Sequence, residues 1–137
     1  MRRFWRCVVA DRRGSTALET TVMLPLIISV MVALVGVYQV LSSRRAVEYG
    51  LEAALRFVAV RSATATQVSI AAAYAAAASA LSSDVGTNSS VNVTPASGFQ
   101  PGQTVQIAVT YQWTPPAAIP LFPAISMNRT ASITVVN

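Results

Sequence analysis

An uncharged run at residues 20–41 constrains this chain more than any other feature of its sequence. It reads TTVMLPLIISVMVALVGVYQVL and contains no Asp, Glu, Lys or Arg. As an α-helix the run is about 33 Å long at 1.5 Å per residue, which matches the hydrocarbon core of a bilayer at roughly 30 Å. Membrane helices tolerate interruptions such as Pro25 and Gly36. Because a chain of 137 residues offers little else to bury such a run, it predicts one transmembrane helix.

Basic residues are concentrated directly before this run. The first thirteen residues hold five of the ten arginines and one acid, whereas the chain from Gly14 onward holds five arginines and four acids. Arginines that precede an apolar span mark its cytoplasmic side. Phe4 and Trp5 lie among these arginines, but a nucleic-acid-binding protein would spread its cations over a folded face, whereas here an apolar run follows at once. We therefore expect no nucleic-acid partner, although the net charge is +5.

The chain has no histidine, and its single cysteine is Cys7. It therefore lacks Ser-His and Cys-His nucleophile pairs, the usual catalytic zinc sites and internal disulfides. Glu48 and Glu52 could be paired carboxylates for acid–base chemistry. Each, however, has an arginine four residues away on the same helical face, Arg44 or Arg56. We expect a solvated ion-pair stripe here, with no catalytic residue, metal or cofactor.

Helical periodicity continues beyond the apolar run and predicts one helix from about residue 17 to residue 61. Its outer part carries an apolar stripe at spacings of three and four, formed by Ala46, Tyr49, Ala53, Phe57 and Val60. Residues 64–82 are rich in alanine, the best helix former, and predict a second helix that ends before Asp84. The packing face expected for this second helix contains Val68, Ala72, Tyr74 and Leu81.

From residue 86 the composition changes to Ser, Thr, Val, Asn and Pro. Alternation of apolar and polar residues predicts strands around residues 91–94, over residues 104–113 and over residues 130–136. The proline-rich residues 114–123 predict a loop, anchored on the core by Leu121 and Phe122. A small three-stranded antiparallel sheet needs a cover for its apolar face, and the outer half of the long helix is the natural candidate. The expected fold class is α+β.

Three parts follow along the chain. Residues 1–14 form a basic leader, residues 15–61 form the transmembrane and extended helix, and residues 62–137 form an outer α+β region.

The most specific signal is the junction RRGSTALE at residues 12–19. A secretory signal has an apolar stretch of 7–15 residues followed by a small-residue cleavage site. Here a short basic leader ends before a longer run, as in a type IV prepilin leader. In that group a membrane peptidase cuts after a glycine on the cytoplasmic side, and a glutamate stands at the fifth mature position. With Ser15 as the first mature residue, Glu19 is the fifth.

Physical chemistry gives each of these residues a role. Gly14 lets an extended backbone enter a protease cleft without a side-chain clash, and Arg12 and Arg13 hold the leader at the cytoplasmic surface. Glu19 lies one turn from the new N-terminus, where the helix dipole favours a negative charge. A carboxylate at the edge of hydrocarbon needs a partner, and the new amino group of Ser15 is the candidate. The alternative is a chance glycine and an ordinary interfacial glutamate, since Gly-x4-Glu alone is a weak motif.

The chain resembles the TadE family, pseudopilins of the tight-adherence (Flp) pilus system. The resemblance covers roughly residues 12–61. It rests on Arg13-Gly14-Ser15, Ala17-Leu18-Glu19, Leu24-Pro25-Leu26, Arg44 or Arg45, and EAALRFVA at residues 52–59. Leu51-Glu52 departs from the family pattern, which often has a basic residue there, and so does Thr20, where an aromatic residue often follows the glutamate. A small β-rich C-terminal end is also implied.

The resemblance implies a structural role as a minor pseudopilin, cleaved after Gly14 by a prepilin peptidase and acting in pilus initiation or at the tip. The implied partners are that peptidase, the major pilin and other pseudopilins, an inner-membrane assembly platform, and membrane lipid. The implied location is a single pass through the inner membrane, with a cytoplasmic N-terminus, a periplasmic C-terminal region and later incorporation into an extracellular pilus.

Two other functions fit the same sequence. One is an uncleaved, membrane-anchored periplasmic binding module. The other is a secreted protein that loses residues 20–41 as a signal, for which Asn-x-Ser/Thr triplets at Asn88, Asn92 and Asn128 would fit glycosylation. The first residue of the mature chain separates the three: Ser15 for the pseudopilin, Met1 for the anchor, and a residue beyond 41 for the secreted form.

Overall fold

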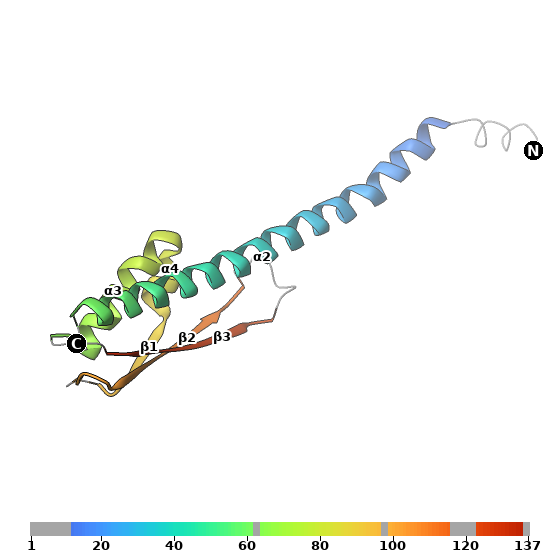
Figure 1. Cartoon of the computed structure of the whole chain (residues 1–137). Helices are drawn as coiled ribbons and strands as arrows, with labels where there is room; N and C mark the ends of the chain where they lie inside the picture. The colour runs from blue at the N-terminus through green and yellow to red at the C-terminus, as the bar shows by residue number, and fades with distance from the viewer. Residues whose placement is uncertain (1–11, 62–63, 97–98, 116–122, 136–137) are drawn as a thin grey trace, which may run out of the picture.

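The computed structural model describes residues 12–61, 64–96, 99–115 and 123–135, with the backbone alone described at residues 12–18. The fold class is α+β, as predicted. The elements in chain order are α2 (Arg12–Arg61), α3 (Gln67–Leu81), α4 (Ser83–Asn88), β1 (Ser90–Thr94), β2 (Thr104–Trp113) and β3 (Ile125–Thr134) (Figure 1). The predicted loop anchors Leu121 and Phe122 and most of the basic leader lie outside the described residues.

The long helix α2 is continuous over 50 residues, which corresponds to about 75 Å. Its first half projects away from the rest of the molecule, whereas its outer half lies along α3 and the sheet (Figure 1). It begins at Arg12, five residues earlier than predicted, and ends at Arg61 as predicted. At that end the backbone N–H groups of Thr64 and Ala65 donate to the Arg61 carbonyl at 3.0 and 2.8 Å. A basic residue in the last turn also suits the helix dipole.

The alanine-rich helix α3 begins with a capping box. Thr66 Oγ1 accepts a hydrogen bond from the Ser69 N–H at 3.3 Å, and Ser69 Oγ accepts one from the Thr66 N–H at 2.8 Å. The short helix α4 follows α3 directly, at the point where the sequence predicted that the second helix ends. Asp84 lies in its first turn, where the helix dipole favours an acid, and Val85 is buried. These two residues explain why the segment stays helical.

The sheet has the order β1-β2-β3, and both pairs of neighbours are antiparallel. Ile107 of β2 lies opposite Val93 of β1 and Ala131 of β3. The bounds of β2 are those predicted, whereas β3 begins at Ile125, five residues earlier than expected. The apolar side chains that alternate along β2 are buried as predicted: Val105, Ile107, Val109, Tyr111 and Trp113.

The core lies between the sheet and the helices that cover one of its faces (Figure 1). We use the term head for residues 43–61 of α2 together with α3, α4 and the sheet. The buried face of α2 is formed by Ala46, Val47, Gly50, Leu51, Ala54 and Val58. The predicted stripe is therefore confirmed at Ala46 and wrong at Tyr49 and Val60, which are 52% and 81% exposed.

The packing face predicted for α3 is also corrected by the structure. Its buried residues are Ile70, Tyr74 and Ala78, spaced by four, whereas Val68 is 79% exposed. Tyr74 lies directly over Gly50 of α2, where an added Cβ would be 2.7 Å from the tyrosine ring. The glycine therefore sets the close approach of the two helices.

Candidate functional site

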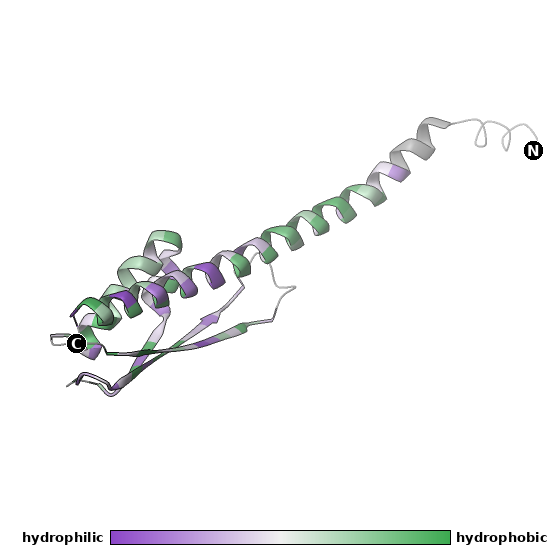
Figure 2. Ribbon diagram, viewed as in Figure 1, coloured by the Kyte–Doolittle hydropathy of each residue, from purple (hydrophilic) through white to green (hydrophobic). Residues whose placement is uncertain are grey.

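The first half of α2 exposes a large apolar surface. Its exposed large hydrophobic residues are Val22, Met23, Leu24, Leu26, Ile27, Ile28, Val30, Met31, Leu34, Val35, Val37, Tyr38 and Leu41. Figure 2 shows the hydrophobic colour along this half of the helix, away from the head. The mean hydropathy of its most apolar 18-residue window is 2.4, and 6% of that window is buried. Core helices of soluble proteins are, by contrast, mostly buried.

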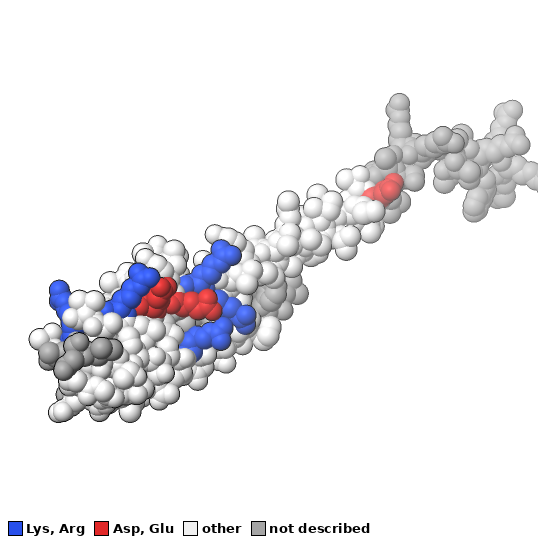
Figure 3. Space-filling view, viewed as in Figure 1, with Lys and Arg blue, Asp and Glu red and all other residues white. Residues whose placement is uncertain are grey.

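By length and composition, this is the one helix in the described part of the chain that could cross a membrane. Charges are absent from residues 20–43 and gather where α2 meets the head (Figure 3). An apolar helix that is exposed on all sides is unfavourable in water, at about 25 cal/mol per Å² of apolar surface. The first half of α2 therefore needs lipid or other helices around it.

The predicted cleavage junction lies at the start of α2. The backbone of Arg12, Arg13, Gly14 and Ser15 is helical, and their side chains lie outside the described part of the structure. An extended backbone at Gly14, which a protease cleft requires, therefore needs local unwinding of the first turn. Helix ends open easily, and glycine is about 1 kcal/mol less favourable in a helix than alanine. Both properties lower the free energy needed to unwind this turn.

Glu19 lies in the second turn of α2, and its side chain is exposed. It is four residues from Ser15, so the two positions share one helical face. Among the described residues the ion pairs do not include Glu19. The predicted pairing of this carboxylate with an amino group at Ser15 requires two positions that share a face, and Ser15 and Glu19 do so.

The charged side chains of the head form exposed pairs. Glu52 and Arg56 pair at 2.5 Å as predicted. Glu48 instead pairs with Arg129 of β3, 81 residues further along the chain, at 3.4 Å. Exposed pairs of this kind contribute about 0–1 kcal/mol. Each carboxylate has an arginine beside it, as an ion-pair stripe requires, with Arg129 in place of the predicted Arg44 as the partner of Glu48.

A polar cluster links three elements inside the head. The Tyr111 hydroxyl on β2 donates to Asp84 of α4, and Ser43 of α2, which is 6% exposed, forms a further hydrogen bond with Tyr111. Burial first, then the hydrogen bond and charge of Asp84, raise the pKa of Tyr111 to about 12. Tyr111 therefore stays protonated at neutral pH and serves as a structural donor. Sequence analysis missed this cluster because no local pattern joins its three members.

A groove of about 420 Å³ lies beside this cluster, at the end of the head nearest the apolar half of α2. Its lining includes Tyr38, Gln39, Ser42, Ser43, Ser82, Asp84 and Trp113. Within the described residues no group of three His, Cys, Asp or Glu is placed to hold a metal ion. Comparisons of the chain with protein-family models, curated proteins and solved structures find no match.

Proposed function

We propose that this chain is a minor pseudopilin of a tight-adherence, type IV-like pilus, cleaved after Gly14 by a prepilin peptidase. The observation that carries the proposal is the division of α2 into two halves. The first half is apolar and exposed, and the second half is part of a folded α+β head. Such a helix can exchange lipid neighbours for the apolar helices of other subunits without any change in the head.

The proposed topology follows from the charges. Arg12 and Arg13 belong to the arginine-rich segment before the span, and this segment stays in the cytoplasm. The head then lies in the periplasm, joined to an inner-membrane helix that crosses once. Cleavage leaves a mature chain of residues 15–137 with Glu19 near its amino terminus. In an assembled pilus, the major pilin and other pseudopilins replace lipid around this helix, after extraction through an inner-membrane platform.

Glu19 gives the proposed assembly step its specificity. A carboxylate surrounded by apolar helices is unfavourable unless it has a cationic partner. The amino group that cleavage creates at Ser15 is such a cation, on the same chain or on an incoming neighbour. The pairing requires removal of the leader, so only processed subunits meet it. A role in initiation or at the tip suits a subunit with a large folded head.

The second candidate function is an uncleaved, membrane-anchored periplasmic binding module. The groove of about 420 Å³ beside Trp113 and Asp84 favours it, because the groove offers polar groups and an aromatic ring to a ligand. The two functions predict different amino termini for the protein in its membrane.

The deciding experiment is the intact mass and N-terminal sequence of the full chain, isolated from cells with and without a co-expressed prepilin peptidase. The pseudopilin proposal predicts Ser15 as the first residue when the peptidase is present and Met1 when it is absent. A chain that still begins at Met1 in the presence of an active peptidase contradicts the proposal and supports the uncleaved module. A known prepilin expressed in the same cells shows that the peptidase is active.

A further inference from the structure

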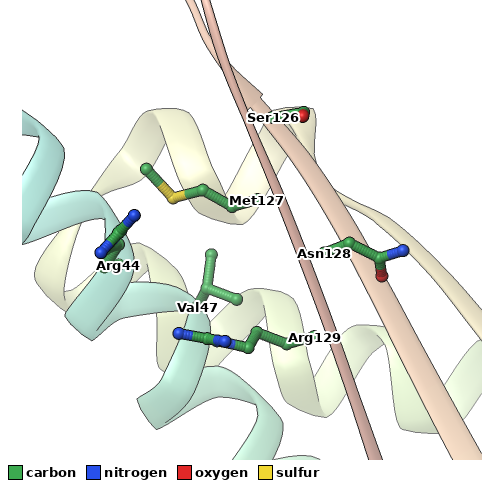
Figure 4. A pocket seen from close by; sticks show the side chains of 6 residues that line it. All are labelled: Arg44, Val47, Ser126, Met127, Asn128 and Arg129. Carbon is green, nitrogen blue, oxygen red and sulfur yellow. The ribbon is translucent and has the colours of Figure 1, made fainter.

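A second, smaller pocket lies between α2 and β3. Its volume is about 110 Å³, and it is lined by Arg44 and Val47 of α2 and by Ser126, Met127, Asn128 and Arg129 of β3. Figure 4 shows Arg129 extending from β3 toward α2, with Val47 between it and Arg44. Since one water molecule occupies about 30 Å³ in the liquid, the pocket has room for one small polyatomic group.

The pocket has more positive than negative charge. Arg129 Nη2 is 3.4 Å from Glu48 Oε1, longer than the 2.7–2.9 Å of a strong charge-assisted hydrogen bond. Arg44 is exposed and, among the described residues, takes part in no ion pair. Arg44 and Arg129 therefore bring two guanidinium groups to the pocket, and the one carboxylate paired with them, that of Glu48, is loosely held by Arg129. The side chains of Ser126 and Asn128 point to the other side of β3 (Figure 4), as alternation along a strand requires. Planar guanidinium groups match the oxygen geometry of phosphate.

The pocket also lies at a defined height relative to the membrane. The apolar run ends at Leu41, and Arg44 follows three residues later, about 4.5 Å along the helix axis. The polar layer on each side of a bilayer is about 5–7 Å thick. With residues 20–41 filling the hydrocarbon core, Arg44 lies at the level of the lipid phosphates, and the neighbouring end of β3 lies beside it. Long arginine side chains near helix ends commonly extend into this layer.

We propose that this pocket binds the phosphate group of an anionic phospholipid in the leaflet that faces the head. Arg44 and Arg129 hold the phosphate oxygens, and Val47 and Met127 form the apolar wall between them. The pocket is too small for a whole lipid, so the acyl chains stay in the bilayer. An anionic headgroup is preferred over a zwitterionic one because the surplus charge of the pocket repels a choline ammonium. The bound lipid holds the head against the membrane surface.

This inference depends on one part of the proposed function, the membrane location of α2, and not on cleavage or pilus assembly. Its test uses the full, unprocessed chain in detergent, titrated with phosphatidylglycerol and, separately, with phosphatidylcholine, with bound lipid counted by native mass spectrometry. The pocket variant is Arg44→Gln with Arg129→Gln. The matched control is Arg56→Gln with Arg61→Gln, which removes the same charge from exposed positions outside the pocket.

We expect the wild-type chain and the control to bind phosphatidylglycerol more tightly than phosphatidylcholine, and the pocket variant to lose about tenfold or more of its affinity for phosphatidylglycerol. Arg44→Lys keeps the charge without the planar fork, so a smaller loss is expected. Circular dichroism checks that all variants keep the wild-type fold. If the double variant does not fold, the lipid affinity of Arg44→Gln alone is measured in its place.

Three results would overturn this lipid site. The first is equal affinity of the wild-type chain for the two lipids, and the second is an equal loss in the control variant. The third is displacement of phosphatidylglycerol by an equal concentration of inorganic phosphate, which would assign the pocket to a soluble anion. None of these results changes the N-terminal residue found with the peptidase, so failure of the lipid site is distinguishable from failure of the pseudopilin proposal.

Discussion

Gly50 shows how a single missing side chain positions one helix on another. An added Cβ would lie 2.7 Å from Tyr74 Cε2 and 3.1 Å from Ala78 Cβ. Alanine would gain about 1 kcal/mol of helix propensity, but overpacking of a closed core loses about 1–3 kcal/mol. Tyr74 is 1% exposed, and its hydroxyl donates to Ser89 Oγ at 3.1 Å, which holds the ring in place. We therefore expect the loss from overpacking to exceed the gain in helix propensity.

Gly50→Ala is therefore predicted to lower the free energy of unfolding of the head by about 1–2 kcal/mol. Denaturant unfolding of the full chain in detergent, followed by near-ultraviolet circular dichroism of the head aromatics, measures this change. Ala59→Ser adds one atom on the exposed side of the same helix and should stay within about 0.5 kcal/mol of wild type. A stabilised Gly50→Ala chain would show that the two helices are not closely packed at this position.

Gly14→Ala is predicted to slow processing by the prepilin peptidase several-fold. Alanine adds a side chain at the cleavage position and also strengthens the helical turn that must unwind there. Intact mass at timed intervals after peptidase induction measures the rate. Gly36→Ala makes the same substitution further along α2 and should be processed like wild type. Equal rates for Gly14→Ala and wild type would refute the assignment of the cleavage site.

Ionisation of Tyr111 makes the stability of the head depend on pH in the alkaline range. Its pKa is higher in the folded state, at about 12, than the ordinary value of 10.0, so the folded state holds the phenol proton more tightly. The stability that this provides is complete below pH 10 and is lost as the pH rises from about 10 to 12. Tyr111→Phe should lack the latest phenolate step in an ultraviolet titration and should lose less stability across this range. An unchanged titration would place the raised pKa on another tyrosine.

Among the elements, alternation identified β2 more accurately than periodicity identified the helix faces. The five buried residues of β2 are large and apolar, so hydrophobicity alone selects them. On α2 the buried face includes Ala46, Gly50 and Ala54, whose small size is what brings α3 close. A search for a hydrophobic stripe instead selects the larger Tyr49, which is 52% exposed. The helix phase depended on the partner α3, and the local sequence does not contain that partner.

The candidate sites also fall into two groups: those that are continuous in the sequence and those that only the fold assembles. The apolar span and the junction around Gly14 are continuous in the sequence. The exposed apolar helix could be predicted from it, whereas cleavage at Gly14 stays a prediction. The pocket between Arg44 and Arg129 and the cluster of Ser43, Asp84 and Tyr111 join residues from separate elements. Only the antiparallel register of β2 and β3 and the position of α2 over the sheet bring their members together.

The first half of α2 and the helices of the head predict different responses to the same substitution. Arginine at the centre of a membrane helix costs about 2.5–3.5 kcal/mol on insertion scales. Val30→Arg with Val35→Arg should therefore reduce the membrane-bound fraction of the chain. Val60→Arg with Val68→Arg should not reduce it, although these valines are even more exposed, at 81% and 79%. Carbonate extraction of isolated membranes compares the two variants, and equal extraction would contradict a membrane location for the first half.

At the scale of the whole molecule, the proposed membrane location places the junction of the span and the head at the level of the lipid headgroups. The apolar surface ends at Leu41, and the contacts of α2 with the head begin around Val40 and Ser43. No flexible linker separates the two, because α2 is a continuous helix through this point. Any movement of the helix out of the bilayer therefore moves the head by the same distance. A lipid held at Arg44 and Arg129 would oppose that movement until other subunits replace the lipid contacts.

Under the proposed function, Glu19 is the residue that separates processing from assembly. Glu19→Ala is predicted to leave cleavage after Gly14 near the wild-type rate, since the carboxylate lies beyond the residues that enter the protease cleft. Assembly should fail, because the amino group of Ser15 would enter an apolar bundle without a counter-charge. Co-sedimentation of the chain with sheared pili measures incorporation, and intact mass measures cleavage in the same cells. Glu52→Ala removes an exposed carboxylate of the head and should assemble normally. Wild-type incorporation of Glu19→Ala would refute the carboxylate–amine pair, and with it the physical reason for processing before assembly.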